Sequence, residues 1–257
     1  MKEPGSVTSL DLIRKIYPGA NPAEQSVNLL YDIIRQKLDF RPEQILHADS
    51  ICCDEVNTIQ YPAAASKMIG SFKMGGLSGY PFAGLAAMNT AAQHIPEQGA
   101  MLISYGPHIG VSHKGIPGEL RRTGQSCDSI CCGAVISSLQ KLKEKLAIPD
   151  IHSEDDYQIN RVQQILLKSE SRLVAAAHPV VEATEVMYEA IDEKIQNLIS
   201  KSELAVRHVF IAGMILINGD FDQGAYYQYR RLEHFDTVNN TKTSWLKEFN
   251  SKAEQNI

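Results

Sequence analysis

The sequence predicts an α/β fold: a single domain over residues 1–257, with a largely parallel central sheet flanked by helices. Apolar segments of strand length, at residues 45–52, 100–105, 209–217 and 226–235, alternate with segments whose apolar residues recur at helical spacing. The run at 209–217 is continuously apolar, which is typical of a strand covered on both faces. With 44% hydrophobic residues and no repeat or linker-like segment, the chain can build one core.

The first predicted helix has a marked start. Asn21 suits its N-cap, Pro22 its first position, and Glu24 completes a spacing close to that of a capping box. Apolar residues then follow at helical spacing, at Leu30, Ile33, Ile34 and Leu38.

Further helices are predicted between the strands, at residues 80–94, after Gly133, after Ser153, at 170–178 and at 180–200. The helix after Gly133 has its apolar positions at Val135, Leu139, Leu142 and Leu146. Ser153 and Asp156 have the spacing of a capping box, and Pro179 separates the last two helices. In such folds, sites collect where parallel strands end.

Charge and hydropathy exclude several kinds of partner. The chain carries 25 Lys and Arg against 30 Asp and Glu, a net charge of −5, so we do not expect it to bind nucleic acid. Its longest apolar run has nine residues, whereas a membrane helix needs about 20. The N-terminal segment lacks an apolar stretch typical of a signal peptide, and we expect a cytoplasmic protein that does not contact membranes.

The five cysteines are confined to residues 52–132. They form two adjacent pairs, Cys52 with Cys53 and Cys131 with Cys132, and Cys127 stands apart. An odd number in a cytosolic chain argues against a disulfide framework and leaves metal binding, catalysis or inert burial.

Reactive side chains recur where predicted strands end. The first cysteine pair and Asp54 follow one strand, His108 follows another, and the second cysteine pair precedes the helix at Gly133. Two thiolates and an imidazole are a ligand set that Zn²⁺ accepts, with a fourth position left open in catalytic sites. Spacing alone indicates a possible metal site, and buried cysteines also serve as small apolar residues.

Five motifs carry a family resemblance, CCDEVN (52–57), GGLSGYPFAG (75–84), SYGPHIGV (104–111), RTGQ (122–125) and CCGA (131–134). Together they resemble the limiting-CO2-inducible B/C protein family, the θ class of carbonic anhydrases, over about residues 20–235. The resemblance implies a fold like that of the β-carbonic anhydrases, a homodimer, and a zinc enzyme that hydrates CO2 reversibly to bicarbonate and a proton.

The resemblance also implies the site residues. By motif position the zinc ligands are Cys52, His108 and Cys132, and Asp54 is the aspartate that orients the nucleophile. His113 lies near His108 but outside its motif. The other six histidines are interpreted as surface or core residues.

Two ligand positions have rivals in the sequence. Cys53 competes with Cys52, but only Cys52 keeps the Cys-x-Asp spacing. Cys131 competes with Cys132, and the motif does not say which thiol faces the metal. Cys127 is interpreted as a bystander.

One position departs from the β-carbonic anhydrase pattern. There the aspartate pairs with an arginine two residues further on, and this chain has Val56 instead. Arg122 is the candidate replacement, with Arg121 beside it. Without such an arginine, Asp54 would close the zinc site, which gives the alternative of a non-catalytic zinc protein acting in binding or assembly. A metal-free thiol enzyme with His108 as its base is a third interpretation.

Overall fold

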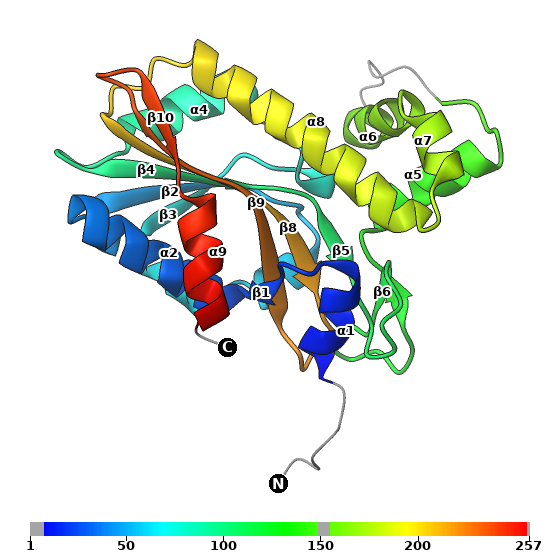
Figure 1. The fold of residues 1–257 in the computed structure, drawn as a ribbon. Helices are drawn as coiled ribbons and strands as arrows, with labels where there is room; N and C mark the ends of the chain where they lie inside the picture. The colour runs from blue at the N-terminus through cyan, green and yellow to red at the C-terminus, as the bar shows by residue number, and fades with distance from the viewer. Residues whose placement is uncertain (1–7, 149–154, 256–257) are drawn as a thin grey trace, which may run out of the picture.

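The computed structural model describes residues 8–148 and 155–255 (Figure 1). Eight of the described strands form one sheet, in which six follow the order β1-β9-β8-β4-β2-β3, β10 pairs with β9 and β5 pairs with β8. Its strands are β1 (Asn21–Pro22), β2 (Ile45–Ser50), β3 (Ile69–Lys73), β4 (Ala100–Tyr105), β5 (His108–Gly110), β8 (His208–Asn218), β9 (Ala225–Asp236) and β10 (Thr241–Ser244). A separate antiparallel pair joins β6 (Glu119–Leu120) to β7 (Ser129–Ile130).

The centre of the sheet is parallel. Strand β2 pairs in parallel with β3 and with β4, and β4 pairs in parallel with β8. Strand β9 then returns antiparallel to β8, and β1 and β10 pair with its outer edge. The predicted class, a mostly parallel sheet with helices around it, is confirmed.

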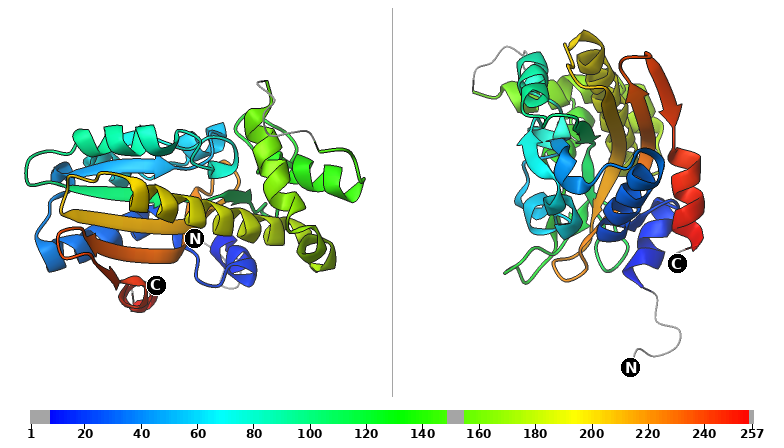
Figure 2. Two further views of the ribbon diagram at one scale, coloured as in Figure 1. Left: turned by 90° about the horizontal axis from the view of Figure 1, so that it is seen from above. Right: turned by 90° about the vertical axis from the view of Figure 1, so that its left-hand side faces the viewer.

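Helices cover both faces of the sheet (Figures 1 and 2). They are α1 (Ser9–Ile16), α2 (Ala23–Leu38), α3 (Glu55–Ile59), α4 (Gly84–Gln93), α5 (Gly133–Lys143), α6 (Tyr157–Leu167), α7 (Glu170–Ala175), α8 (Pro179–Lys201) and α9 (Leu246–Gln255). Helices α2 and α9 pack on one face, and α4 and α8 lie on the other, with α5, α6 and α7 beside α8. Strands β2 and β4 are buried along their whole length between these layers. This burial explains the nearly unbroken apolar sequence of β4, whereas β2 also buries the polar residues His47, Asp49 and Ser50.

The predicted start of the first helix is wrong in its details. Asn21 lies in β1, where its side-chain oxygen accepts a hydrogen bond from Arg14, and Pro22 holds the N-cap position without a side-chain bond. The Glu24 carboxylate reaches across to the backbone N–H of Ala64 rather than back to the cap. Tertiary contacts therefore use the polar groups that a capping box would have used.

Other helix boundaries also differ from expectation, since α4 begins at Gly84 rather than at residue 80 and α7 ends at Ala175 rather than at residue 178. Helix α5 ends at Lys143, so Leu146 lies beyond it and is half exposed. Asp156 makes no side-chain capping bond to α6, and Ser153 lies outside the described residues. Sequence analysis also missed β3, whose Gly and Ser residues weaken the strand pattern at the sheet edge.

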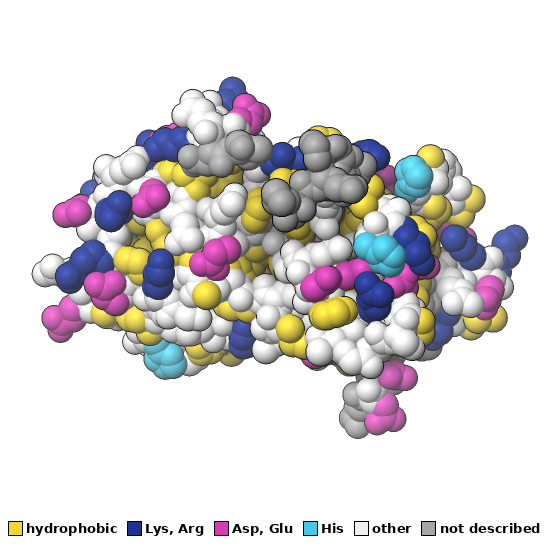
Figure 3. Space-filling model, turned by 90° about the horizontal axis from the view of Figure 1, so that it is seen from below, with side chains coloured by type: hydrophobic (Ala, Val, Ile, Leu, Met, Phe, Trp, Pro, Cys, Tyr) yellow, Lys and Arg dark blue, Asp and Glu magenta, His cyan; other side chains and the backbone are white. Residues whose placement is uncertain are grey.

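The surface agrees with the modest net charge. The face in Figure 3 intersperses acidic, basic and apolar side chains. Among the described residues, no helix is both long and apolar enough to cross a membrane.

One buried histidine gives a testable pH dependence. His47 is 4% exposed, and its Nδ1 lies 3.1 Å from the Tyr61 hydroxyl. Burial lowers the pKa of His47 to about 4, and Lys73 adds to this effect against the opposing charge of Asp49. In the unfolded chain the imidazole of His47 is protonated below about pH 6.5, whereas in the folded chain it stays neutral down to about pH 4. The contribution of His47 to the free energy of unfolding is therefore fully present above pH 6.5 and is lost as the pH falls towards 4.

We expect His47 to account for about 3 kcal/mol of the loss between pH 6.5 and 4. His47→Gln should flatten this part of the stability profile, measured by urea unfolding at each pH. The exposed His94 provides the matched control, His94→Gln, which should leave the profile unchanged. A His47→Gln profile parallel to that of the native chain would contradict the expectation.

A second prediction concerns the turn between β4 and β5. A Cβ atom on Gly106 would lie 1.7 Å from the carbonyl oxygen of Met214, so Gly106→Ala must displace backbone. Gly224→Ala is the control, because Gly224 has a positive φ but open space around it and should cost only about 1 kcal/mol. We expect Gly106→Ala to lose at least about 2 kcal/mol more than the control in urea unfolding. Equal losses would show that the close approach is not a constraint.

Candidate metal centre

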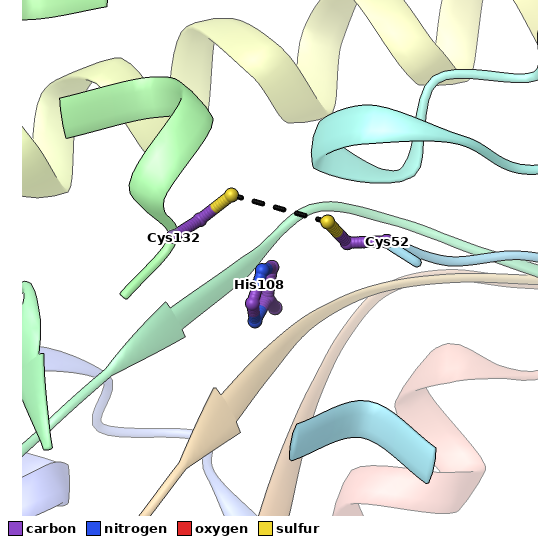
Figure 4. Close-up of side chains that lie close together, drawn as sticks. All are labelled: Cys52, His108 and Cys132. Carbon is purple, nitrogen blue, oxygen red and sulfur yellow. Dashed lines mark hydrogen bonds between the residues drawn. The ribbon is translucent and has the colours of Figure 1, made fainter. Parts of the chain in front are cut away.

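Three separate elements bring Cys52, His108 and Cys132 together (Figure 4). Cys52 lies two residues after the end of β2, His108 begins β5, and Cys132 is the N-cap residue of α5. All three side chains are buried, and their candidate ligand atoms lie within 4.8 Å of one another. The structure therefore brings together the three residues that the sequence motifs select.

The spacing of the two sulfurs suits a tetrahedral metal. The Sγ atoms of Cys52 and Cys132 are 4.0 Å apart. Two thiolates at about 2.3 Å from a tetrahedral Zn²⁺ would be about 3.8 Å apart. Two soft sulfur donors and one imidazole nitrogen are also a set that favours zinc over magnesium or calcium.

A hydrogen bond to Asn218 fixes the orientation of the His108 ring. Its Nδ1 lies 2.9 Å from Oδ1 of Asn218, whose Nδ2 donates to Oε1 of Gln60 at 3.0 Å. Because Oδ1 of Asn218 can only accept, Nδ1 of His108 is the donor, and Nε2 is left for the cluster. This Nε2 is buried and has no hydrogen-bond partner among the described residues, as expected for a ligand atom supported through its other nitrogen.

Electrostatics within the cluster favour a cation. The hydrogen bond from Cys52 lowers the pKa of Cys132 well below its usual value despite burial, and the same bond raises the pKa of Cys52. Burial opposes a charged His108, but its interactions with the side chains of Cys131 and Cys132 raise its pKa above the usual range. A metal that binds here displaces those protons and replaces their charge.

The carboxylate of Asp54 is held by Arg122 through two parallel hydrogen bonds. Nη1 of Arg122 donates to Oδ1 at 2.7 Å, and Nη2 donates to Oδ2 at 3.1 Å. Arg122 is itself fixed by the Ser129 hydroxyl, the Ile130 carbonyl and Glu55. The predicted partners therefore meet, although 68 residues separate them in the chain.

This pair stands at the edge of the cluster. Oδ2 of Asp54 is 3.9 Å from Nε2 of His108, and the backbone N–H of Val56 donates to Oδ1. Burial works to raise the pKa of Asp54, but the Arg122 hydrogen bonds and the charge of His108 lower it to about 2. Asp54 is thus an ionised acceptor whose oxygens are already engaged by donors.

The rival residues occupy different places. Cys53 is exposed, as is Cys127. Cys131 is buried and forms a second possible group with Asp54 and His108, with its sulfur 3.5 Å from Nδ1 of the histidine. That nitrogen is the one that faces Asn218, so the arrangement favours Cys132 as the second thiolate.

His113 stands in a different group of side chains. Its Nδ1 is 2.8 Å from the buried Asp220, and Asp128 lies beside them. Asp220 also accepts the backbone N–H of Arg121. These bonds anchor the loops around the site, and none of them directs His113 toward Cys52.

Sequence analysis missed the residues that support the cluster, namely Ser78, Asn218 and Gln60. Asn218 gave a signal, since it is a polar residue directly after the apolar run at 209–217. Ser78 lies inside the Gly-rich motif, but nothing in the motif indicates that its backbone N–H reaches a sulfur.

Comparisons with known proteins agree with this geometry. The family model of the limiting CO2-inducible proteins B/C β-carbonic anhydrases matches residues 21–236. The crystal structure of PtLCIB4, a homolog of the limiting CO2-inducible protein LCIB, is 25% identical, with 92% of this chain and 99% of that chain covered and a TM-score of 0.82. A search of curated proteins finds no match.

Two further structures show the same fold. A histidine-to-alanine mutant of PtLCIB4 is 24% identical over 93% of this chain and 98% of its own, with a TM-score of 0.84. LCIB itself is 18% identical over 90% of this chain and 95% of its own, with a TM-score of 0.66. Since the family model covers most of the sequence, the chain belongs to the limiting CO2-inducible protein B/C family of β-carbonic anhydrases.

Proposed function

We propose that this chain is a zinc-dependent carbonic anhydrase that converts CO2 and water reversibly to bicarbonate and a proton. Cys52, His108 and Cys132 would hold the zinc through two sulfurs and Nε2. The observation that carries the proposal is the pair of hydrogen bonds from Arg122 to the carboxylate of Asp54. These bonds would keep the carboxylate from occupying the fourth coordination position of the metal.

The chain's own residues then have defined tasks. When bound, zinc would lower the pKa of a coordinated water from about 15.7 to about 7 and so supply a nucleophile at neutral pH. Asp54 would remain ionised and accept a hydrogen bond from the hydroxyl group of this nucleophile, which would aim the oxygen lone pair at the carbon of CO2. Arg122 fixes the direction of that acceptor, and Asn218 keeps Nδ1 of His108 as the donor so that Nε2 faces the metal.

A homodimer is part of the same proposal. Two apolar side chains beside the site, Ile59 in α3 and Ile130 in β7, are more than half exposed. A second copy of the chain would cover such residues, as the family resemblance implies. Light scattering of the purified protein would report the mass of the assembly.

The metal assignment predicts one zinc per chain, measured by elemental analysis. Cys52→Ala, His108→Ala and Cys132→Ala should each lose the metal, since two remaining ligands bind zinc weakly. Cys127→Ala, at an exposed cysteine, should keep it. Cys131→Ala should also keep it, and loss of zinc from this variant with retention in Cys132→Ala would reverse the choice between the two thiols.

The role of Arg122 gives a separate prediction. Arg122→Leu should retain zinc but lose about 100-fold in the rate of CO2 hydration, because Asp54 is freed to turn toward the metal. Stopped-flow hydration of the zinc-loaded protein measures this rate, and Arg121→Leu, one residue away, is the matched control. A native protein with full zinc and no rate above buffer would overturn the catalytic proposal and leave a closed, non-catalytic zinc site.

A further inference from the structure

Ser78 occupies an unusual backbone position next to the two sulfurs. It lies in the short turn Leu77–Gly79 within the Gly-rich motif, and it is fully buried. Its φ of 56° and ψ of 13° place a non-glycine residue in the left-handed region, where a side chain is unfavourable. Such strain persists where the surrounding structure over-determines the conformation, and it clusters at functional sites.

The turn is held in place on both sides. The backbone N–H of Leu77 donates to Oε1 of Gln158 at 2.9 Å. Gly79 has a positive φ, and a Cβ atom there would lie 2.3 Å from the carbonyl oxygen of Gly106. The turn therefore packs closely against the backbone of Gly106, two residues before His108, and this contact restricts the movement of Ser78.

From this position Ser78 contacts both thiols. Its backbone N–H donates to Sγ of Cys52 at 3.2 Å, and its Oγ lies 3.7 Å from Sγ of Cys132. The two sulfurs are themselves 4.0 Å apart. One residue thus contacts both sulfurs that would hold the metal.

We propose that Ser78 is a positioning residue for the metal, acting through hydrogen bonds to the two thiolates. This inference rests on the zinc site of the proposed function. An N–H or O–H donor stabilises a thiolate and draws electron density away from the sulfur, so the sulfur donates less charge to a metal. A neutral set of two thiolates and one imidazole weakens the electrophilicity of zinc, and the Ser78 bonds restore part of it.

The test is Ser78→Gly with cobalt(II) as a spectroscopic probe. Glycine tolerates the left-handed backbone and keeps the N–H, so the variant removes the hydroxymethyl side chain and leaves the backbone hydrogen bond to Cys52 in place. The thiolate-to-cobalt absorption band should move to longer wavelength, because the sulfur of Cys132 becomes a stronger donor. Zinc affinity, measured against a chromophoric chelator, should nevertheless fall about 10-fold, because the Ser78 hydroxyl no longer holds the Cys132 sulfur in position.

The control is Ser138→Ala in α5. Ser138 is also fully buried, but its hydroxyl donates to the Ala134 carbonyl. This variant should leave both the band and the affinity unchanged.

The outcomes separate this inference from the proposed function. If Ser78→Gly keeps the native thiolate-to-cobalt band and the native zinc affinity, the Ser78 hydroxyl has no effect on the metal site, and the inference is overturned. A shifted band in a protein that does not hydrate CO2 supports Ser78 while overturning the catalytic proposal. Absence of any thiolate-to-cobalt band in the native protein overturns the metal site and this inference with it.

Discussion

The parallel alignment of β2, β4 and β8 is the constraint on which the site depends. Ser50 at the end of β2 pairs with Tyr105 at the end of β4, and Tyr105 pairs with Gly213 of β8. Because strands in this register end at one edge, the residues that follow them emerge side by side. Cys52 and His108 meet for this reason, and the continuation of β8 to Asn218 brings the hydrogen-bond partner of His108 to the same edge.

Burial on both faces makes that register robust. The side chains of β2 alternate between the core under α8, which takes Leu46 and Ala48, and the core under α2, which takes Ile45. A slip of one residue would exchange the two sets and carry Cys52 to the wrong face. The burial of these strands therefore stabilises the sheet and also determines on which face of it the thiol of Cys52 lies.

This dependence explains what the sequence could predict. The strands and most helices follow from apolar periodicity, and the cysteines and His108 stand out because few residue types bind zinc. The contacts of Ser78 and Gln60 were out of reach, because the first depends on a loop conformation and the second on a partner more than a hundred residues distant. Likewise the polar groups of Asn21 and Glu24 fit a local cap in sequence, yet in the fold they bond to Arg14 and Ala64.

Val56 shows how a local departure is compensated at long range. Its side chain is buried in an apolar contact with Leu120 and Cys131. The arginine comes instead from the segment between β6 and β7, where Ser129 and the Ile130 carbonyl hold it against Asp54. An arginine two residues from the aspartate would be positioned by one turn of α3, whereas Arg122 is positioned by the pairing of β6 with β7. The orientation of Asp54 is therefore coupled to the folding of that hairpin, and the same hairpin leads directly into Cys131 and Cys132.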